Sequence, residues 1–126
     1  GSILPIIRSE GFNCSAITWA DSALKEIGKK QHDLLIIRDL WFGYGGEIPK
    51  NVDIKSFGEE LAYGMHIAKE AVKNGLEVLV FHTELDDKAA KEIKKIGGSV
   101  LEFGSMSTVY IPKIKEILGK RAEKQA

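Results

Sequence analysis

The chain has 126 residues, of which 44% are hydrophobic and 29% charged, and its 18 basic side chains balance 18 acidic ones. This composition fits one globular domain and lacks the basic excess of a nucleic-acid binder. No apolar run reaches the roughly 18 residues of a membrane span, and a single cysteine, Cys14, cannot form an internal disulfide. We therefore expect a cytoplasmic domain that binds neither nucleic acid nor membrane. It covers residues 1–126, with Gly1-Ser2 typical of a cloning remnant and a frayed tail after about residue 119.

In the first half of the chain we expect a helix, a strand, a second helix and a buried strand, over Ile3–Glu10, Phe12–Trp19, Ala20–Lys30 and Asp33–Ile37. Asp21 is the expected N-cap of the second helix. The last strand is a continuous apolar run, as in parallel sheets covered on both faces. The segment Trp41–Phe57 is glycine-rich and irregular. It follows the carboxyl end of that strand, where open α/β sheets bind ligands.

In the second half, three helices alternate with two strands, over Leu61–Val72, Glu77–Phe81, Ala89–Ile96, Ser99–Phe103 and Ile111–Leu118. Asn74-Gly75 and Gly97-Gly98 are typical helix ends, and Pro112 is expected in the first turn of the last helix. Ser99–Phe103 is the less apolar strand and is expected near an edge. Alternation of this kind predicts a parallel sheet with helices on both faces.

Several segments resemble response-regulator receiver domains, namely Ile7–Phe12, Asp21–Leu24, His32–Leu40, Gly58–Ala62 and Gly97-Gly98. In that family the first helix ends in Glu-x-Gly-Phe, and the third strand reads Pro-Asp-Leu followed by apolar residues and the phosphoacceptor Asp. The resemblance is a pattern of spacings over nearly the whole chain. It implies a three-layer, flavodoxin-like or CheY-like parallel sheet with helices on both faces, from which the first strand is absent.

The departures from the receiver pattern concern the phosphorylation site. The acidic residues that hold Mg²⁺ in receivers follow a first strand that this sequence lacks, and no Lys stands near Phe103-Gly104. The phosphoacceptor position falls on Arg38 when counted from one side and on Asp39 from the other. The switch position falls on His82 or Thr83. Asp39 with Thr83 would restore a phosphoacceptor using Mg²⁺, whereas Arg38 with His82 would place a permanent cation in an inactive pocket.

Three aromatic residues of the long loop, Trp41, Phe42 and Tyr44, are candidates for an exposed partner-binding patch, because aromatic side chains anchor interfaces. Packing back over the sheet is the alternative. Glu84, Asp86 and Asp87 could bind a hard cation with Asp39, or could interact with the dipole at the start of a helix. Cys14 is expected to be buried and inert, and His32 and His66 to lie on the surface without a role.

In receivers the first strand lies between the second and third strands of the sheet. A chain without it must pair Phe12–Trp19 directly with the strand 34–37, or take a strand from elsewhere, because unpaired central backbone groups are costly. The resemblance therefore predicts a rearranged four-stranded sheet or a homodimer that exchanges elements. The expected function is a signalling or scaffold interaction module without catalysis or cofactor. It would bind a protein partner through Trp41–Phe57 and the last helix. The alternatives are a phosphoacceptor and a small ligand-binding domain or enzyme.

Overall fold

A three-stranded parallel sheet lies at the centre of the computed structural model, in the order β1 (Leu34–Ile37), β2 (Glu77–His82), β3 (Ser99–Glu102). The structure describes residues 3–38, 40, 44–82, 87–102 and 104–125, without the side chains of Glu59, Glu60 and His82. The helices of this part are α1 (Leu4–Ser9), α2 (Ala20–Gly28), α3 (Ile54–Phe57), α4 (Glu59–Lys73), α5 (Asp87–Lys95) and α6 (Ser107–Gln125).

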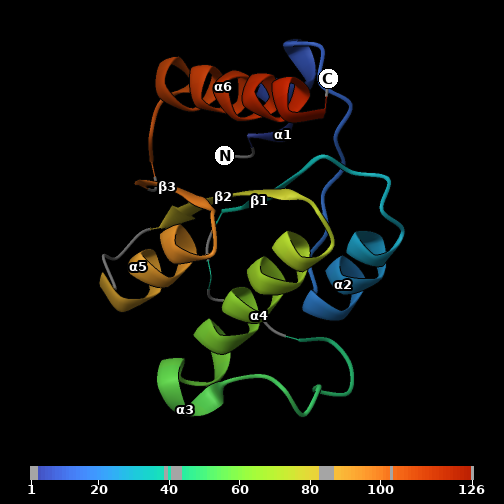
Figure 1. Ribbon diagram of the computed structural model, residues 1–126, viewed down its shortest axis with the longest axis vertical. Coiled ribbons are helices and arrows are strands. Elements are labelled where there is room, and N and C mark those ends of the chain that lie inside the picture. Colours follow the sequence, from blue (N-terminus) through green and yellow to red (C-terminus); the bar gives the residue numbers. More distant parts are fainter. Residues whose placement is uncertain (1–2, 39, 41–43, 83–86, 103, 126) are drawn as a thin grey trace.

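Helices cover both faces of the sheet, α1 and α6 on one side and α2, α4 and α5 on the other (Figure 1). The central strand β2 divides its side chains between the two layers. Leu79 and Phe81 pack with α6, while Val78 and Val80 pack with α4 and α5. Because successive side chains of a strand point to opposite faces, a continuous apolar run fills both layers at once. The predicted layered α/β arrangement is confirmed, and it is compatible with a flavodoxin-like fold.

The strands predicted at 33–37, 77–81 and 99–103 all form, and β3 is an edge strand as expected. Ile37 of β1 pairs with Val80 of β2, so both strands end at the same edge of the sheet. The helix ends also follow the sequence, because Gly75 and Gly97 have φ angles of 86° and 98°, which favour glycine. No helix among the described residues is long and apolar enough to cross a membrane.

The predicted strand at Phe12–Trp19 is wrong. This segment forms no ladder with β1, so the described sheet has three strands, and the expected four-stranded rearrangement is wrong as well. A ladder requires neighbouring backbones about 4.8 Å apart. A cavity instead lies between β1 and residues 13–19, so the two segments are not paired.

The ends of α6 also differ from the prediction. The helix begins at Ser107, which places Pro112 inside it and not in its first turn. It continues to Gln125 without the expected fraying. Arg121 holds the last turns of α6 against the sheet, where its Nη1 donates to the carbonyl of Gly75 at 2.6 Å and its Nε lies 3.3 Å from Asp33 Oδ1. Charged hydrogen bonds of this kind are among the stronger ones, and they order a tail that composition alone predicts to be loose.

Candidate functional site

The predicted phosphorylation site lies where β1 and β2 end. Arg38 directly follows β1 and is exposed, and the backbone of His82 ends β2 beside Glu102 of β3. The parallel register brings these two positions to one edge of the sheet. Asp39 and Thr83 lie outside the described residues, so the choice between Asp39 with Thr83 and Arg38 with His82 remains a prediction.

The chain just after β1 is held tightly against α4. Leu40 is only 1% exposed, and Gly64 of α4 faces its backbone. A Cβ added at Gly64 would lie 2.6 Å from the Leu40 carbonyl oxygen and 2.8 Å from its Cα. Because glycine has no side chain, α4 can approach the backbone of Leu40 closely at this position. This contact fixes the path of the backbone on the C-terminal side of Arg38.

Tyr44 is buried, which corrects its assignment to an exposed partner-binding patch. Its ring packs edge-to-face on Tyr63 of α4 at 5.5 Å, so the side chain turns inward against this helix. Burial, and secondarily the nearby Asp21 carboxylate, raises the pKa of the Tyr44 hydroxyl. The other two aromatic candidates, Trp41 and Phe42, lie outside the described residues.

The loop containing Tyr44 is joined to the start of α2. The Tyr44 carbonyl accepts a hydrogen bond of 2.9 Å from the backbone N–H of Asp21, and Gly45 lies against Trp19 with a φ of 87°. The N-cap of α2 is Trp19, not Asp21, whose Oδ1 instead accepts from the Ser22 N–H. Residues 13–19 therefore end beside the loop that follows β1.

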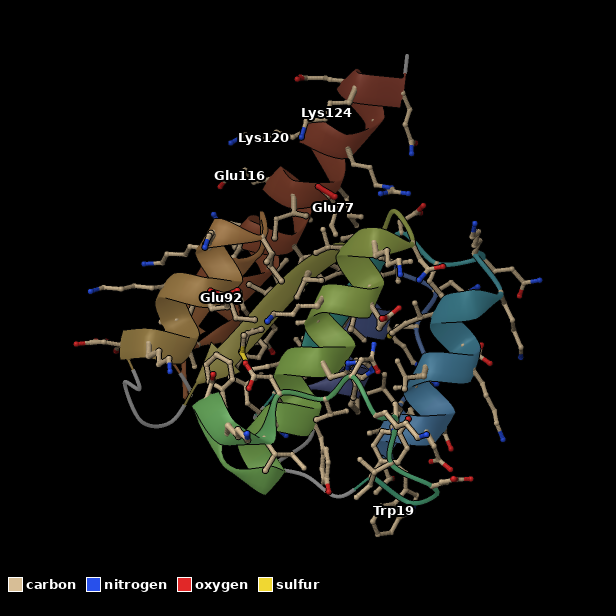
Figure 2. All side chains as sticks on the ribbon, turned by 60° about the horizontal axis from the view of Figure 1, so that its bottom comes forward. Trp19, Glu77, Glu92, Glu116, Lys120 and Lys124 are labelled. Atoms are coloured by element: carbon tan, nitrogen blue, oxygen red, sulfur yellow. The ribbon has the colours of Figure 1, made fainter. Side chains whose placement is uncertain are left out.

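An apolar slot of about 460 Å³ lies beside the open edge of β1. β1 forms one wall and residues 13–19 another, while α1 and α2 contribute apolar side chains such as Ile7 and Ile27. Ile17 and Trp19 border the slot and are 43% and 52% exposed. Figure 2 shows Trp19 projecting from the surface near the start of α2. The slot is therefore bordered on its outer side by the exposed apolar side chains of Ile17 and Trp19.

Polar groups lie at both ends of the slot. Near the start of β1, Glu26 Oε1 lies 3.0 Å from His32 Nε2, and Lys29 pairs with the same carboxylate. The hydrogen bond from Lys29, followed by that with His32, lowers the pKa of Glu26. Arg38, which directly follows β1, lines the slot at the other end. One end of the slot therefore holds a carboxylate that is already paired with a cation, and the other holds an arginine.

The outer wall of the slot is fixed to α1. Arg8 donates two hydrogen bonds to the carbonyl of Cys14, from Nε at 3.1 Å and from Nη2 at 3.0 Å. Cys14 is half-buried and lines the slot, whereas the sequence predicts a buried residue. These contacts hold the wall in place while the space beside β1 stays open.

A second buried polar group, His66 on α4, lies apart from the slot beneath residues 51–57. The expectation of a surface position for His66 is therefore wrong. Desolvation lowers the pKa of its imidazole, with Lys69 acting in the same direction and Glu70 opposing. The ring is therefore predominantly neutral at pH 7, and it belongs to the packing of α4.

The predicted cation cluster gains no support in the described part of the chain, where no group of three or more His, Cys, Asp or Glu residues could hold a metal ion. Asp87 is the first residue of α5 and is exposed. Glu84, Asp86 and Asp39 lie outside the described residues. Binding of Mg²⁺ at this site therefore remains a prediction.

Comparisons of the chain with protein-family models, with curated proteins and with solved structures gave no match. What the structure defines is a class, an α/β protein with a three-stranded parallel sheet between helices and an apolar slot along β1. Sequence reasoning did not predict the slot as a site. The sequence did contain a sign of it in the strand 34–37. This strand is apolar on both faces, but in the described sheet it pairs with another strand on one side only.

Proposed function

We propose that the chain is a signalling or scaffold protein-interaction module, a degenerate receiver-type domain that carries out no phosphotransfer. The slot and its exposed border carry this proposal. Ile17 and Trp19 are large apolar side chains that leave about half of their surface in water beside an apolar cavity. Exposed apolar side chains at the mouth of an apolar cavity are surface that a partner or ligand would remove from water on binding.

The charge at the C-terminal edge of the sheet supports a role without phosphotransfer. A phosphoryl acceptor needs a metal ion to neutralise the charge that develops on the phosphoryl oxygens. Arg38 follows β1 at this edge and carries a permanent positive charge. A fixed cation there would replace the metal electrostatically and would compete with its binding. The same domain could then hold one conformation permanently, as a scaffold requires.

Phosphorylation chemistry provides the test. The protein is incubated with phosphoramidate and Mg²⁺ and its intact mass is measured, and amide NMR spectra are recorded with Mg²⁺ and then beryllofluoride. If the chain is an interaction module, we expect neither a phosphoryl adduct nor NMR chemical-shift changes centred on residue 39. A Mg²⁺-dependent adduct that disappears in Asp39→Asn would overturn the proposal in favour of a phosphoacceptor with Thr83 as its switch residue.

A small apolar ligand is the second candidate, because a cavity of about 460 Å³ lies within the range of roughly 300–1,000 Å³ typical of ligand pockets. The polar groups at the two ends would then orient the ligand. Titration of the protein with 1-anilinonaphthalene-8-sulfonate distinguishes a site from a general surface. Saturable binding at one site that Ile17→Asp weakens would favour this candidate, whereas weak, non-saturable binding would exclude it.

A further inference from the structure

Residues 51–57 form a covering segment over the side chain of His66. The segment ends in α3, which lies at the N-terminal end of α4 and away from the sheet (Figure 1). Asn51, Asp53 and Phe57 of the segment line a cavity of about 30 Å³ together with His66, which is only 8% exposed. An imidazolium needs water or acceptors around it, and a cavity of this size holds no more than a few water molecules. The closed segment therefore favours the neutral ring.

The covering segment is held to the rest of the molecule by weak contacts. No residue of α3 is buried, and Val52 and Phe57 are only partly buried against the core. From α5, Lys88 donates from its Nζ to the carbonyl of Ser56 at 3.2 Å and lies 5.1 Å from the centre of the Phe57 ring. Lys69 of α4 lies over the same ring at 5.8 Å. Because contacts made by lysine side chains in water are weak, this segment belongs to the part of the fold that opens most easily.

Gly58 provides a hinge between the covering segment and α4. It has a φ of 78° and a ψ of 163°, a backbone conformation that glycine adopts readily and other residues rarely. Within the segment, Asp53 Oδ1 accepts from the N–H of Ser56 at 3.1 Å, and the carbonyl of Ile54 accepts from that of Gly58 at 2.8 Å. These bonds are local, so α3 can swing away from α4 as a unit. Its other end continues into residues 45–50, which are exposed or half-buried.

Burial dominates the protonation of the ring beneath the segment. Desolvation is the largest effect and lowers the pKa of His66, and Lys69 acts in the same direction. Glu70, also on α4, opposes both without compensating for burial. Removal of the cover would therefore remove the main cause that keeps a proton off this imidazole.

The elements packed on α4 offer the ring no uncommitted counter-charge among the described side chains. In the covering segment, the carboxylate of Asp53 already accepts from Ser56. On α5, Glu92 pairs with Lys69 at 3.5 Å, and Lys88 is itself a cation. The described residues of α2 do not line the cavity, and β1 and β2 direct apolar side chains toward α4. A proton on His66 therefore adds a poorly compensated charge beneath the segment, which favours opening.

We propose that the covering segment is an acid-sensitive flap, which is closed over neutral His66 and swings open about Gly58 when the imidazole takes up a proton. In the open state the ring is solvated and has its ordinary pKa of about 6.5. The open state then binds a proton at a higher pH than the closed state, so its population rises as the pH falls below about 6.5. Opening exposes Ala62 and Met65 of α4, which are 1% and 2% exposed under the segment. This device is independent of the proposed interaction module.

The reactivity of a thiol placed under the segment tests the flap. Cys14→Ser removes the native thiol, and Ala62→Cys adds one at a position that lines the cavity. The reagent is 4,4′-dithiodipyridine, which reacts with thiols in mild acid, and each rate is divided by that of glutathione at the same pH. This ratio should rise about three- to tenfold from pH 7.5 to pH 5.5, where about tenfold is the ceiling for one imidazole that titrates at pH 6.5 only in the open state.

A second position on α4 separates the flap from global unfolding. Ala71 is 0% exposed and does not line the cavity, so Ala71→Cys in the same Cys14→Ser background is the matched control. Its thiol reacts only when α4 leaves the sheet, and its ratio should be at least about tenfold lower than that at position 62. Urea at low concentration should accelerate the reaction at position 71 more than at position 62, because local opening exposes less surface.

Three further substitutions identify the trigger and the latch. His66→Gln should abolish the acid-dependent rise at position 62, because Gln takes up no proton. His32→Gln removes a histidine outside this cavity and should preserve the rise. Lys88→Met removes the contact with Ser56 and should increase the reactivity at position 62 at both pH values.

Equal ratios at positions 62 and 71 would overturn the flap, because both thiols would then react through global unfolding. A ratio at position 62 that does not change with pH, or a rise that persists in His66→Gln, would overturn His66 as the trigger. If Ala62→Cys does not fold, the unsubstituted protein decides by NMR. The amide shifts of Val52 and Phe57 should titrate with the same midpoint as the His66 imidazole, and separate midpoints would overturn the proposal.

Discussion

The two edges of the sheet differ in ways that have physical consequences. β3 begins with Ser99 and ends with the exposed Glu102, and a glycine with a φ of 84° follows at position 104. β1 consists only of Leu and Ile, without a charged or small residue among its four. Charged residues and short strands discourage pairing at a natural edge. By this criterion β3 has the composition of an edge strand, whereas β1 has that of an internal strand, although the described residues supply it with only one neighbour.

Burial follows the same division. On β2, which has strands on both sides, Leu79, Val80 and Phe81 are between 0% and 4% exposed. On β1 only Ile37 is buried, and Leu34, Leu35 and Ile36 keep intermediate exposure. Apolar side chains on β1 therefore contribute less to the stability of the chain than equivalent side chains on β2. The difference defines a covered side of the molecule around β2 and α6, and an open side around β1 and α2.

Leucine truncation on each side gives the largest expected contrast. Leu79→Ala removes a fully buried side chain and should reduce the free energy of unfolding by about 3–5 kcal/mol. Leu34→Ala, at the slot, should cost about 1 kcal/mol because its side chain is only partly removed from water. Urea denaturation followed by circular dichroism measures both values. Equal losses would mean that the slot is filled in solution.

A glycine-to-alanine pair tests the tight contact between α4 and the chain after β1. Gly64→Ala would force the new Cβ against the backbone of Leu40 and should cost about 2 kcal/mol. Gly119→Ala, in the exposed interior of α6, meets no atom within 4 Å and should gain about 0.5–1 kcal/mol by helix propensity. Thermal unfolding of the two variants should therefore shift in opposite directions. A stabilising Gly64→Ala would show that α4 can move away from the chain after β1.

The sequence was sufficient to predict the three strands and the ends of two helices. Continuous apolar runs identify β2 and β1, and the Asn74-Gly75 and Gly97-Gly98 pairs mark where α4 and α5 end. These signals are local, because they depend on periodicity and on the φ angles that glycine permits. The order of the strands in a parallel sheet then follows from short crossover connections.

The open side depends on distant contacts that no local pattern contains. The segment 12–19 has strand-like composition, but Arg8 and the loop at Tyr44 hold it away from β1. Gly64 looks like an unfavourable helix residue until the chain after β1 is placed against it. Likewise the order of the last turns of α6 depends on Arg121, whose partners Asp33 and Gly75 are far away in sequence. The slot was not predicted because it is the space between β1 and residues 13–19, and these two segments are not paired with each other.

Tyr110 on α6 offers a smaller test of packing on the covered side. Its ring packs edge-to-face on Phe81 at 5.7 Å, and its buried hydroxyl has no hydrogen-bond partner among the described residues. Tyr110→Phe keeps the ring and removes the unpaired group, so it should stabilise the fold by about 1 kcal/mol. Tyr110→Leu removes the ring as well and should be destabilising. A loss of stability in Tyr110→Phe would reveal a partner for the hydroxyl.

Acid provides the smallest test, because His66 and His32 stand in opposite settings. His66 is buried on α4, whereas His32 is half-exposed at the end of the slot beside Glu26. Burial lowers the pKa of His66 below its ordinary value of 6.5. The unfolded chain therefore binds a proton at a higher pH than the folded chain does, and stability falls as the pH drops below about 6.5.

This acid dependence is measured as the free energy of unfolding in urea between pH 7.5 and pH 5, for the wild type and for His66→Gln. The wild type should lose more stability than the variant over this window, because Gln cannot take up a proton. Identical pH profiles would show that the imidazole is solvated when folded and that residues 51–57 do not cover it.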